Sequence, residues 1–255
     1  MKMLQVLWLV LGLSCATAWT APVLIVADEF PAMEEFARQL QKQENLDSQL
    51  VKQTEMPGEL KSFKAVVVYI HGKLAPTAEK AFVDYTQAGG KLIVLHHSIS
   101  SGKRANEHWF PFLGVTLPTG DVNQGGYKWT EGVTMDIVNL ATNHFITTNK
   151  LKYDSQFSFA EAGKPELTLP GFTLHESEVY LNHLLKGERT LLLGLKYKDA
   201  KTGKAWAQSH AGWYRTSGKG WIYYFLPGHS IREFQHPAYL RILLNAVVHQ
   251  PNQSN

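Results

Sequence analysis

Three short apolar runs separated by helix-like segments constrain the fold more than any other feature of this sequence. Val23–Ala27, Ala65–Ile70 and Leu92–Leu95 are rich in β-branched residues and contain almost no polar side chain, which is typical of strands buried on both faces. Between them, Met33–Gln43 and Thr77–Ala88 place apolar residues at helical spacing. This alternation predicts an α/β fold with a doubly wound, mostly parallel sheet and helices on both of its faces.

The second half of the chain has a different pattern. From about residue 114 to residue 171 the sequence is rich in Gly, Thr, Asn and Pro, and its strand-like stretches are short, among them Thr134–Val138 and Tyr153–Phe159. We expect loops and antiparallel pairs there, an irregular β-rich insertion that covers one end of the sheet, and the pattern assigns this region no role. The regular elements expected after it are strands at Glu178–Leu184, Thr190–Tyr197, Ala205–Arg215 and Trp221–Leu226, and a helix at Pro237–Val248.

The N-terminus has the order of features that marks a secretory signal peptide. Lys2 gives a positive start, an apolar run follows, and Ala16–Ala18 places small residues at a cleavage site. The run is about ten residues long, too short for the roughly 20 that span a bilayer. We therefore expect residues 1–18 to be removed and residues 19–255 to form one exported α/β domain, periplasmic or secreted. A buried first element and a lipid anchor at Cys15 are the alternatives.

Composition excludes several classes of function. The one cysteine of the chain would leave with the signal peptide, so the mature domain has no thiol nucleophile, disulfide or thiolate metal ligand. The formal net charge is +3 and no block of Lys and Arg stands out, so no nucleic-acid partner is predicted. No second long apolar run exists, so we expect no membrane span. The sequence does not indicate the oligomeric state.

Polar side chains follow four of the predicted buried strands, and three of these four ends carry histidine. The ends are Asp28-Glu29, His71, His96-His97-Ser98 and Gly228-His229-Ser230. Because the carboxyl ends of parallel strands meet at one edge of a sheet, we expect His96 and His229 on the same side, within reach of one small ligand. Neutral imidazole can act there as a base, a hydrogen-bond partner or a metal ligand.

Plainer interpretations compete at each strand end. Asp28 and Glu29 suit the capping of the helix that follows, which is the reading we favour. His71 is expected at the surface, because loops after strands are generally polar. His97 is expected to point away from His96, because neighbours on an extended chain face opposite sides. No positional signal distinguishes the remaining candidates, which we expect at the surface or at the edge of the core: His108, His175, His210, His236 and His249.

Aromatic residues are frequent in the second half. Flat rings with hydroxyl or indole donors suit the binding of sugars, although ordinary core packing explains most of them. They are Tyr127, Trp129, Tyr180, Trp206, Trp213 and Tyr214.

Five segments, in order along the chain, share features with one known family. They are Gly89–His96, Trp109–Gly114, Asn143–Thr147, Ser177–Tyr180, and an ending that runs from Trp213 through Gly218–Gly220 and Tyr223 to His229. Together they resemble the trehalose-utilisation (ThuA-like) family: a glycine pair, an apolar run and a histidine, then a helix ending in Leu-Gly, a His-x-Ile-Thr segment, a Glu-x-Tyr segment and a final Gly-His. No single segment is specific, but the five cover nearly the whole predicted mature chain.

The resemblance implies the flavodoxin-like fold of the class I glutamine amidotransferase-like superfamily. In those enzymes a cysteine follows a strand on a sharp turn, near the place that His96 takes here, so the absence of a mature cysteine excludes amidotransferase chemistry. The family is linked to the metabolism of disaccharides and oxidised (3-keto) sugars. This chain departs from the family pattern at Lys91, Phe145, Ser177 and Trp221, and the loss of a carboxylate at Ser177 argues against a mechanism with two acids.

These observations together predict an exported protein that acts on a sugar or sugar derivative. We expect His96, Glu178 and His229 to be catalytic, with Glu178 or a histidine as the general base. The residues expected to bind substrate are His144, Tyr180, Trp213 and His97.

Two questions about the site stay open at this point. A divalent metal such as zinc is possible at His96, Glu178 and His229, with His144 as a further candidate, but no compact ligand spacing supports it and no other cofactor is indicated. The protein could also bind carbohydrate without turning it over, or serve as a structural module of a larger complex.

Overall fold

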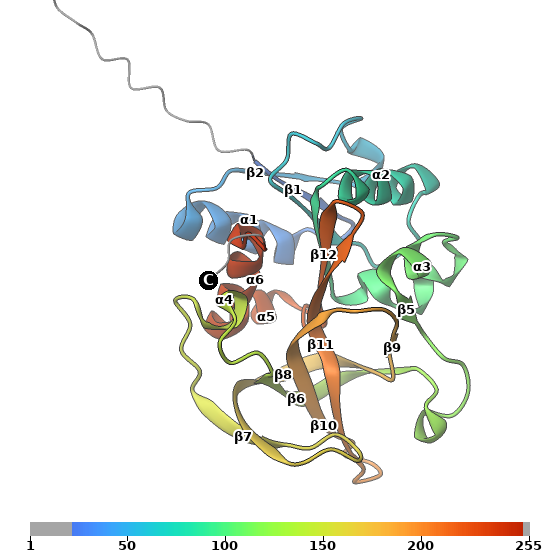
Figure 1. The fold of residues 1–255 in the computed structure, drawn as a ribbon, viewed down its shortest axis with the longest axis vertical. Helices are drawn as coiled ribbons and strands as arrows, with labels where there is room; N and C mark the ends of the chain where they lie inside the picture. Colours follow the sequence, from blue (N-terminus) through green and yellow to red (C-terminus); the bar gives the residue numbers. More distant parts are fainter. Residues whose placement is uncertain (1–21, 252–255) are drawn as a thin grey trace, which may run out of the picture.

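One ten-stranded sheet forms the centre of the protein. The computed structural model describes residues 22–251, and the predicted signal peptide, residues 1–18, lies outside the described residues. Within the described part of the chain, no helix is long and apolar enough to cross a membrane. The strand order is β2-β1-β3-β4-β12-β11-β10-β6-β8-β7, and β5 and β9 pair separately as a small two-stranded sheet (Figure 1).

The first five strands in this order are parallel, as the apolar runs predict. All residues of β1, β3 and β4 are buried, because layers of helix cover both faces of this part of the sheet. The bounds are β1 Val23–Ala27, β2 Ser48–Val51, β3 Ala65–Tyr69, β4 Lys91–Leu95 and β12 Gly220–Phe225.

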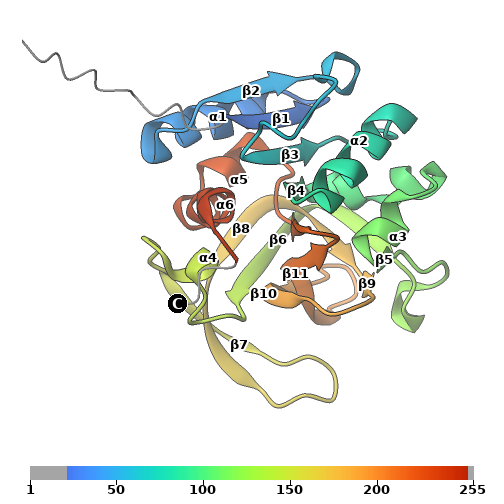
Figure 2. The same cartoon turned by 45° about the horizontal axis from the view of Figure 1, so that its top comes forward.

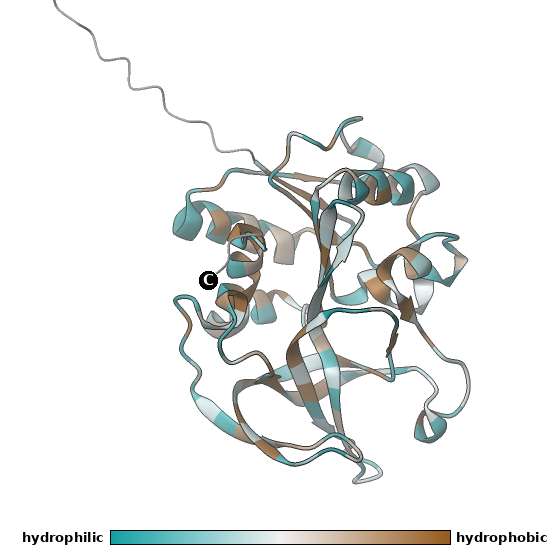
Figure 3. Cartoon of the chain, in the orientation of Figure 1, coloured by the Kyte–Doolittle hydropathy of each residue, from teal (hydrophilic) through white to brown (hydrophobic). Residues whose placement is uncertain are grey.

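Two layers of helix enclose the parallel strands. The helices α1, α5 and α6 pack together on one face, while α2 and α3 cover the other (Figures 1 and 2). Figure 3 shows hydrophobic and hydrophilic positions on opposite sides of α1, whose buried side chains include Met33, Phe36 and Leu40. The α/β fold with helices on both faces is thus confirmed. The bounds are α1 Pro31–Glu44, α2 Pro76–Gln87, α3 Trp109–Leu113, α4 Phe145–Thr148, α5 Ile231–Gln235 and α6 Pro237–Val248.

The other five strands extend the same sheet in antiparallel fashion. The expected β-rich region is therefore part of the main sheet, and its strands are longer than the sequence suggests. Gly132 and Glu176 have positive φ, and the pairing of β6 with β8 changes register nearby, so the alternation of buried and exposed residues is interrupted there. The bounds are β5 Val115–Thr116, β6 Lys128–Asn139, β7 Ser155–Phe159, β8 Leu167–Leu181, β9 Leu184–Leu185, β10 Thr190–Lys198 and β11 Ala205–Ser217.

A buried amine holds the carboxyl ends of β3 and β4 together. Lys103 follows β4 in a 3-10 segment and is fully buried. Its Nζ donates hydrogen bonds to the carbonyl oxygens of Ile70, His71 and His97. Burial lowers the pKa of Lys103 to about 7. The backbone after both strands is therefore fixed by one side chain.

Replacing this amine should destabilise the protein. In Lys103→Met the three carbonyl oxygens lose their donor, and each unsatisfied buried group costs about 1–3 kcal/mol, partly offset by relief of the buried amine. We expect the free energy of unfolding, measured with urea, to fall by about 3 kcal/mol. The control Lys80→Met removes an exposed lysine paired with Asp84 and should change it by less than about 0.5 kcal/mol. Equal stability of the two variants would contradict this role for Lys103.

Candidate functional site

The turn after β4 places His96 in an unusual backbone conformation. His96 has φ of 47°, in the left-handed region that side chains other than glycine rarely adopt, and its ring is fully buried. Nδ1 lies 2.7 Å from the carbonyl oxygen of Leu226, and Nε2 lies 2.9 Å from Oε2 of Glu178. Because a carbonyl oxygen only accepts, Nδ1 is the donor of the first of these hydrogen bonds, and Nε2 faces the carboxylate.

Glu178 is the centre of the candidate site. It lies near the end of β8, is almost fully buried, and its Oε2 also receives a hydrogen bond from the Tyr180 hydroxyl at 3.0 Å. Nδ1 of His229 lies 3.4 Å from the same oxygen. Burial alone would raise the pKa of Glu178, but hydrogen bonds from His229 and His96 outweigh it and lower the pKa to about 2. The carboxylate therefore stays ionised at neutral pH.

His229 is the member of the cluster that faces solvent. Its side chain is 32% exposed, and its ring stands edge-on to that of His96, with centroids 5.8 Å apart. The hydrogen bond with Glu178 raises the pKa of His229. The structure thus brings His96, Glu178 and His229 together at the carboxyl edge of the parallel strands. Their catalytic role stays a prediction.

Hydrogen bonds to buried residues fix the loop that carries His229, and the sequence alone did not identify these residues. Tyr69 donates a hydrogen bond from its hydroxyl to the carbonyl oxygen of Gly228 at 2.7 Å, Tyr239 donates one to Pro227, and the Glu233 carboxylate accepts one from the Gly228 amide. Gly228 has φ of 143°, and a Cβ there would lie 2.9 Å from the Cβ of His96. Only glycine lets this loop approach His96 so closely.

Of the residues expected to bind substrate, Tyr180 joins the cluster and His97 adjoins it. The Tyr180 ring stacks on His96 with centroids 5.1 Å apart. His97 does not point away from His96, because the strand ends before it and the chain turns into a 3-10 segment. Its ring lies 5.0 Å from that of His96 and packs against Tyr69 and His71.

His144 and Trp213 lie elsewhere. His144 caps α4 and contacts Tyr214 and His249, near the opposite edge of the parallel strands. Trp213 is fully buried and packs between Tyr224 and Arg189. The prediction that both bind substrate rests on the order of the family motifs, and this order does not show at which end of the sheet a residue lies.

The expected capping of α1 is also wrong. The Asp28 carboxylate accepts hydrogen bonds from the backbone amides of His71 and Gly72 instead, and no side chain caps the helix. The N-cap residue of α1 is Phe30, whose side chain has no acceptor, and Asp28 lies two residues before it and bonds to the turn after β3. His71 is exposed, as expected, and its Nδ1 lies 3.2 Å from Oε1 of Glu29.

His96, Glu178 and His229 each offer one ligand atom, and these atoms lie within 4.8 Å of one another. The donor set of two imidazoles and one carboxylate suits a divalent metal such as zinc. His144, the further candidate, is not part of the group.

A hollow of about 310 Å³ lies beside Tyr127, and none of His96, Glu178 and His229 lines it. Its volume is near the lower limit of small-molecule sites, which measure about 300–1,000 Å³. Its lining includes Arg104, Tyr127 and Trp129, and the Trp129 side chain is among the exposed large hydrophobic groups. The ring of Tyr127 lies 6.1 Å from that of Tyr180, which stacks on His96. An aromatic surface of this kind suits the flat face of a sugar ring.

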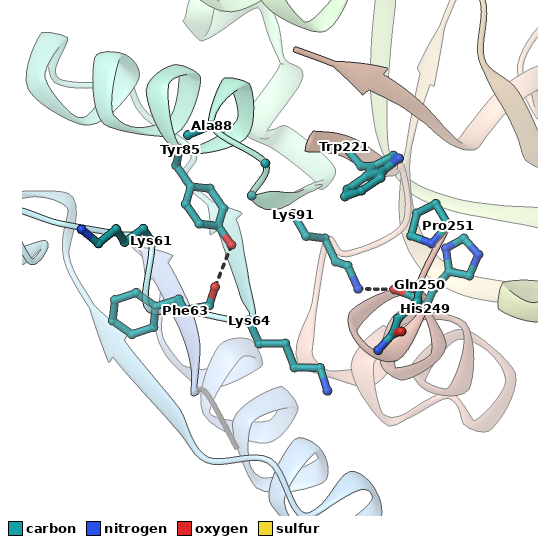
Figure 4. Close-up of a pocket in the computed structure, with 12 residues that line it drawn as sticks. Lys61, Phe63, Lys64, Tyr85, Ala88, Lys91, Trp221, His249, Gln250 and Pro251 are labelled. Atoms are coloured by element: carbon teal, nitrogen blue, oxygen red, sulfur yellow. Dashed lines mark hydrogen bonds between the residues drawn. The ribbon is translucent and has the colours of Figure 1, made fainter. Parts of the chain in front are cut away.

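Another cavity lies at the opposite edge of the sheet, where β4 and β12 begin (Figure 4). Lys61, Lys64 and Tyr85 are part of its wall. The hydroxyl of Tyr85 and the amine of Lys91 already bond to backbone carbonyls. The described residues that line this cavity form no group like the His–Glu–His cluster, so we place the candidate chemistry at the carboxyl edge.

Comparisons with known proteins agree with this architecture. The ThuA family model, described as trehalose utilisation, matches residues 22–249. A ThuA-like protein from Bacteroides uniformis ATCC 8492 is 19% identical, with a TM-score of 0.62 over 92% of this chain and 95% of that one. One from Parabacteroides merdae ATCC 43184 is 14% identical, with a TM-score of 0.60 over 92% of each chain. A cytoplasmic protein from Salmonella typhimurium LT2 is 15% identical, with a TM-score of 0.56 over 89% of this chain and 98% of that one. A search of curated sequences finds no match. At such identities the structural likeness shows the fold alone.

The Glu178 carboxylate should control the proton affinity of His229. In Glu178→Gln the negative charge and its hydrogen bond to His229 are lost, so the pKa of His229 should fall. Titration of the imidazole by NMR measures this, with Glu107→Gln, an exposed carboxylate outside the cluster, as the control. An unchanged His229 pKa in Glu178→Gln would mean that the two side chains do not interact in solution.

Proposed function

The chain belongs to the ThuA family, described as trehalose utilisation, and from this premise we propose that it is an enzyme acting on a sugar or sugar derivative at the His96–Glu178–His229 cluster. The observation that carries the proposal is the solvent-facing imidazole of His229 held by a buried, ionised carboxylate. The substrate class we propose is a disaccharide or a 3-keto sugar, and the aromatic hollow at Tyr127 and Trp129 supports a ligand with flat, hydroxylated rings.

The geometry favours His229 as the general base. Its Nδ1 faces Glu178, so Nε2 is the nitrogen left to meet a substrate. A carboxylate on one imidazole nitrogen fixes the tautomer and stabilises the imidazolium that forms when the other nitrogen takes a proton. Glu178 itself is a weak base, since its pKa is about 2, and His96 is fully buried. His229 would then remove a proton from a sugar hydroxyl or from a carbon next to a ketone, while the Glu178 carboxylate stabilises the imidazolium that forms.

Kinetics of three variants test this assignment. Purified protein is incubated with ordinary and 3-keto disaccharides, and products are separated by chromatography. His229→Ala should lower kcat by about 10²–10⁴-fold, the usual contribution of a positioned base, when measured at a temperature at which the variant stays folded. The control is His108→Ala, at an exposed histidine outside the cluster. Because the base must be neutral, the rate should rise as pH increases through the raised pKa of His229, and Glu178→Gln should move this limb to lower pH.

Two outcomes would reject the proposal. Sugar binding without product formation by the unsubstituted protein would support the alternative, a non-catalytic carbohydrate-binding protein. Turnover that is equal in His229→Ala and His108→Ala would place the chemistry elsewhere in the chain.

We further propose that the protein is exported to the periplasm or beyond. The order of positive start, apolar run and small-residue site in residues 1–18 supports this. Mass spectrometry of the exported protein should find Trp19 at the N-terminus. Retention of Met1, or a lipid on Cys15, would contradict cleavage after Ala18.

A further inference from the structure

A second cluster of histidine and carboxylate lies beside the candidate site and shares none of its side chains. Glu29, His71 and His97 follow β1, β3 and β4, three neighbouring strands of the sheet. Each offers one ligand atom, and the three atoms lie within 4.8 Å of one another. Neither the family nor the proposed general base accounts for this group.

His97 is the feature that points to a ligand. Its side chain is buried, with 4% of the residue exposed, and its Nε2 has no hydrogen-bond partner. A buried polar atom without a partner destabilises the folded state, so such atoms usually have a water, an ion or a functional role. Burial also lowers the pKa of His97, so the ring is neutral at neutral pH and keeps the lone pair that a metal requires.

We propose that Glu29, His71 and His97 bind one divalent transition-metal ion of the Zn²⁺ class. Two imidazoles and one carboxylate are a common set of three ligands for this ion, with the fourth position left for water or substrate. The proposal adds to the function proposed above and does not depend on it, because the two clusters have no side chain in common.

One of the three separations already agrees with this ligand set, and the other two are at most 4.8 Å. Ligands that share a tetrahedral Zn²⁺ at about 2.0–2.2 Å lie roughly 3.3–3.5 Å from each other. The 3.2 Å between Nδ1 of His71 and Oε1 of Glu29 is already close to this value. The side chains of His71 and Glu29 are 68% and 50% exposed, so both can adjust to meet the fixed ring of His97.

Hydrogen bonds hold the backbone of two of the three ligand residues in place. The Nζ of Lys103 donates to the carbonyl oxygens of His71 and His97, and the Asp28 carboxylate accepts from the amide of His71. Supporting contacts of this kind orient the ligands of metal sites. The plainer explanation, an exposed ion pair of Glu29 with His71, accounts for neither the unpartnered Nε2 nor the packing of the two histidine rings 4.7 Å apart.

Zinc binding by the full chain, purified without an affinity tag and treated with chelator, tests the proposal. The protein is dialysed against the lowest concentration of free Zn²⁺, up to about 1 µM, that fills the site of the unsubstituted protein, and the metal is counted by elemental analysis. Glu29→Gln and His71→Ala should each hold one equivalent fewer than the unsubstituted protein. Loss of partners outside the first coordination shell already weakens metal sites about 10–100-fold, so loss of a ligand should weaken binding by at least about 100-fold.

Two further variants make the result specific. His229→Ala should retain the equivalent that Glu29→Gln loses, because His229 belongs to the other cluster, and His108→Ala should match the unsubstituted protein. Substitution with Co²⁺ should give the visible absorption of a tetrahedral site, which Glu29→Gln should abolish. Absence of Zn²⁺ from the unsubstituted protein would overturn the proposal. Equal metal content in Glu29→Gln, His71→Ala and the unsubstituted protein would do so too, as would loss of this equivalent in His229→Ala.

Discussion

The rest of the site depends on one interaction, the pairing of the buried Glu178 carboxylate with the imidazoles of His96 and His229. An ionised carboxylate away from water is stable only when other groups supply hydrogen bonds and opposite charge. Here His96 and His229 come from the ends of β4 and β12, in the parallel half of the sheet, while Glu178 and Tyr180 come from β8 in the antiparallel half. The partners of this one charge therefore join the two halves of the sheet at its carboxyl edge. The antiparallel half supplies the carboxylate, and the parallel half supplies the imidazoles.

The parallel half could be predicted from sequence and the antiparallel half only in outline, for a physical reason. Strands buried on both faces must be continuously apolar, and β1, β3 and β4 have this local signature. The long strands β6 and β8 expose part of one face and contain irregular positions at Gly132 and Glu176, so no alternation persists along their length. Their pairing depends on contacts between segments about 40 residues apart, which no local pattern records.

The site was predicted where it follows from strand ends and missed where it depends on backbone contacts. His96 and His229 follow from the rule that parallel strands end at one edge, and Glu178 came from the family resemblance. Tyr69 and Tyr239 support the His229 loop through its carbonyl groups, a role that any buried tyrosine could have. Nothing in the sequence around either residue distinguishes this role from ordinary packing.

Glu233 is a second buried carboxyl group that interacts with His96. The serine at position 177 argued against a pair of carboxyl groups, yet the fold supplies a second, buried carboxyl group from α5. Burial raises the pKa of Glu233, opposed chiefly by the neighbouring His96, whereas the pKa of Glu178 is lowered. Environments that shift the pKa values of two carboxyl groups in opposite directions are typical of acid–base pairs. Glu233 is only 1% exposed, however, and its carboxylate holds the amide of Gly228. Glu233 therefore holds the loop that carries His229, and its burial is consistent with the proposal that His229, which faces solvent, is the general base.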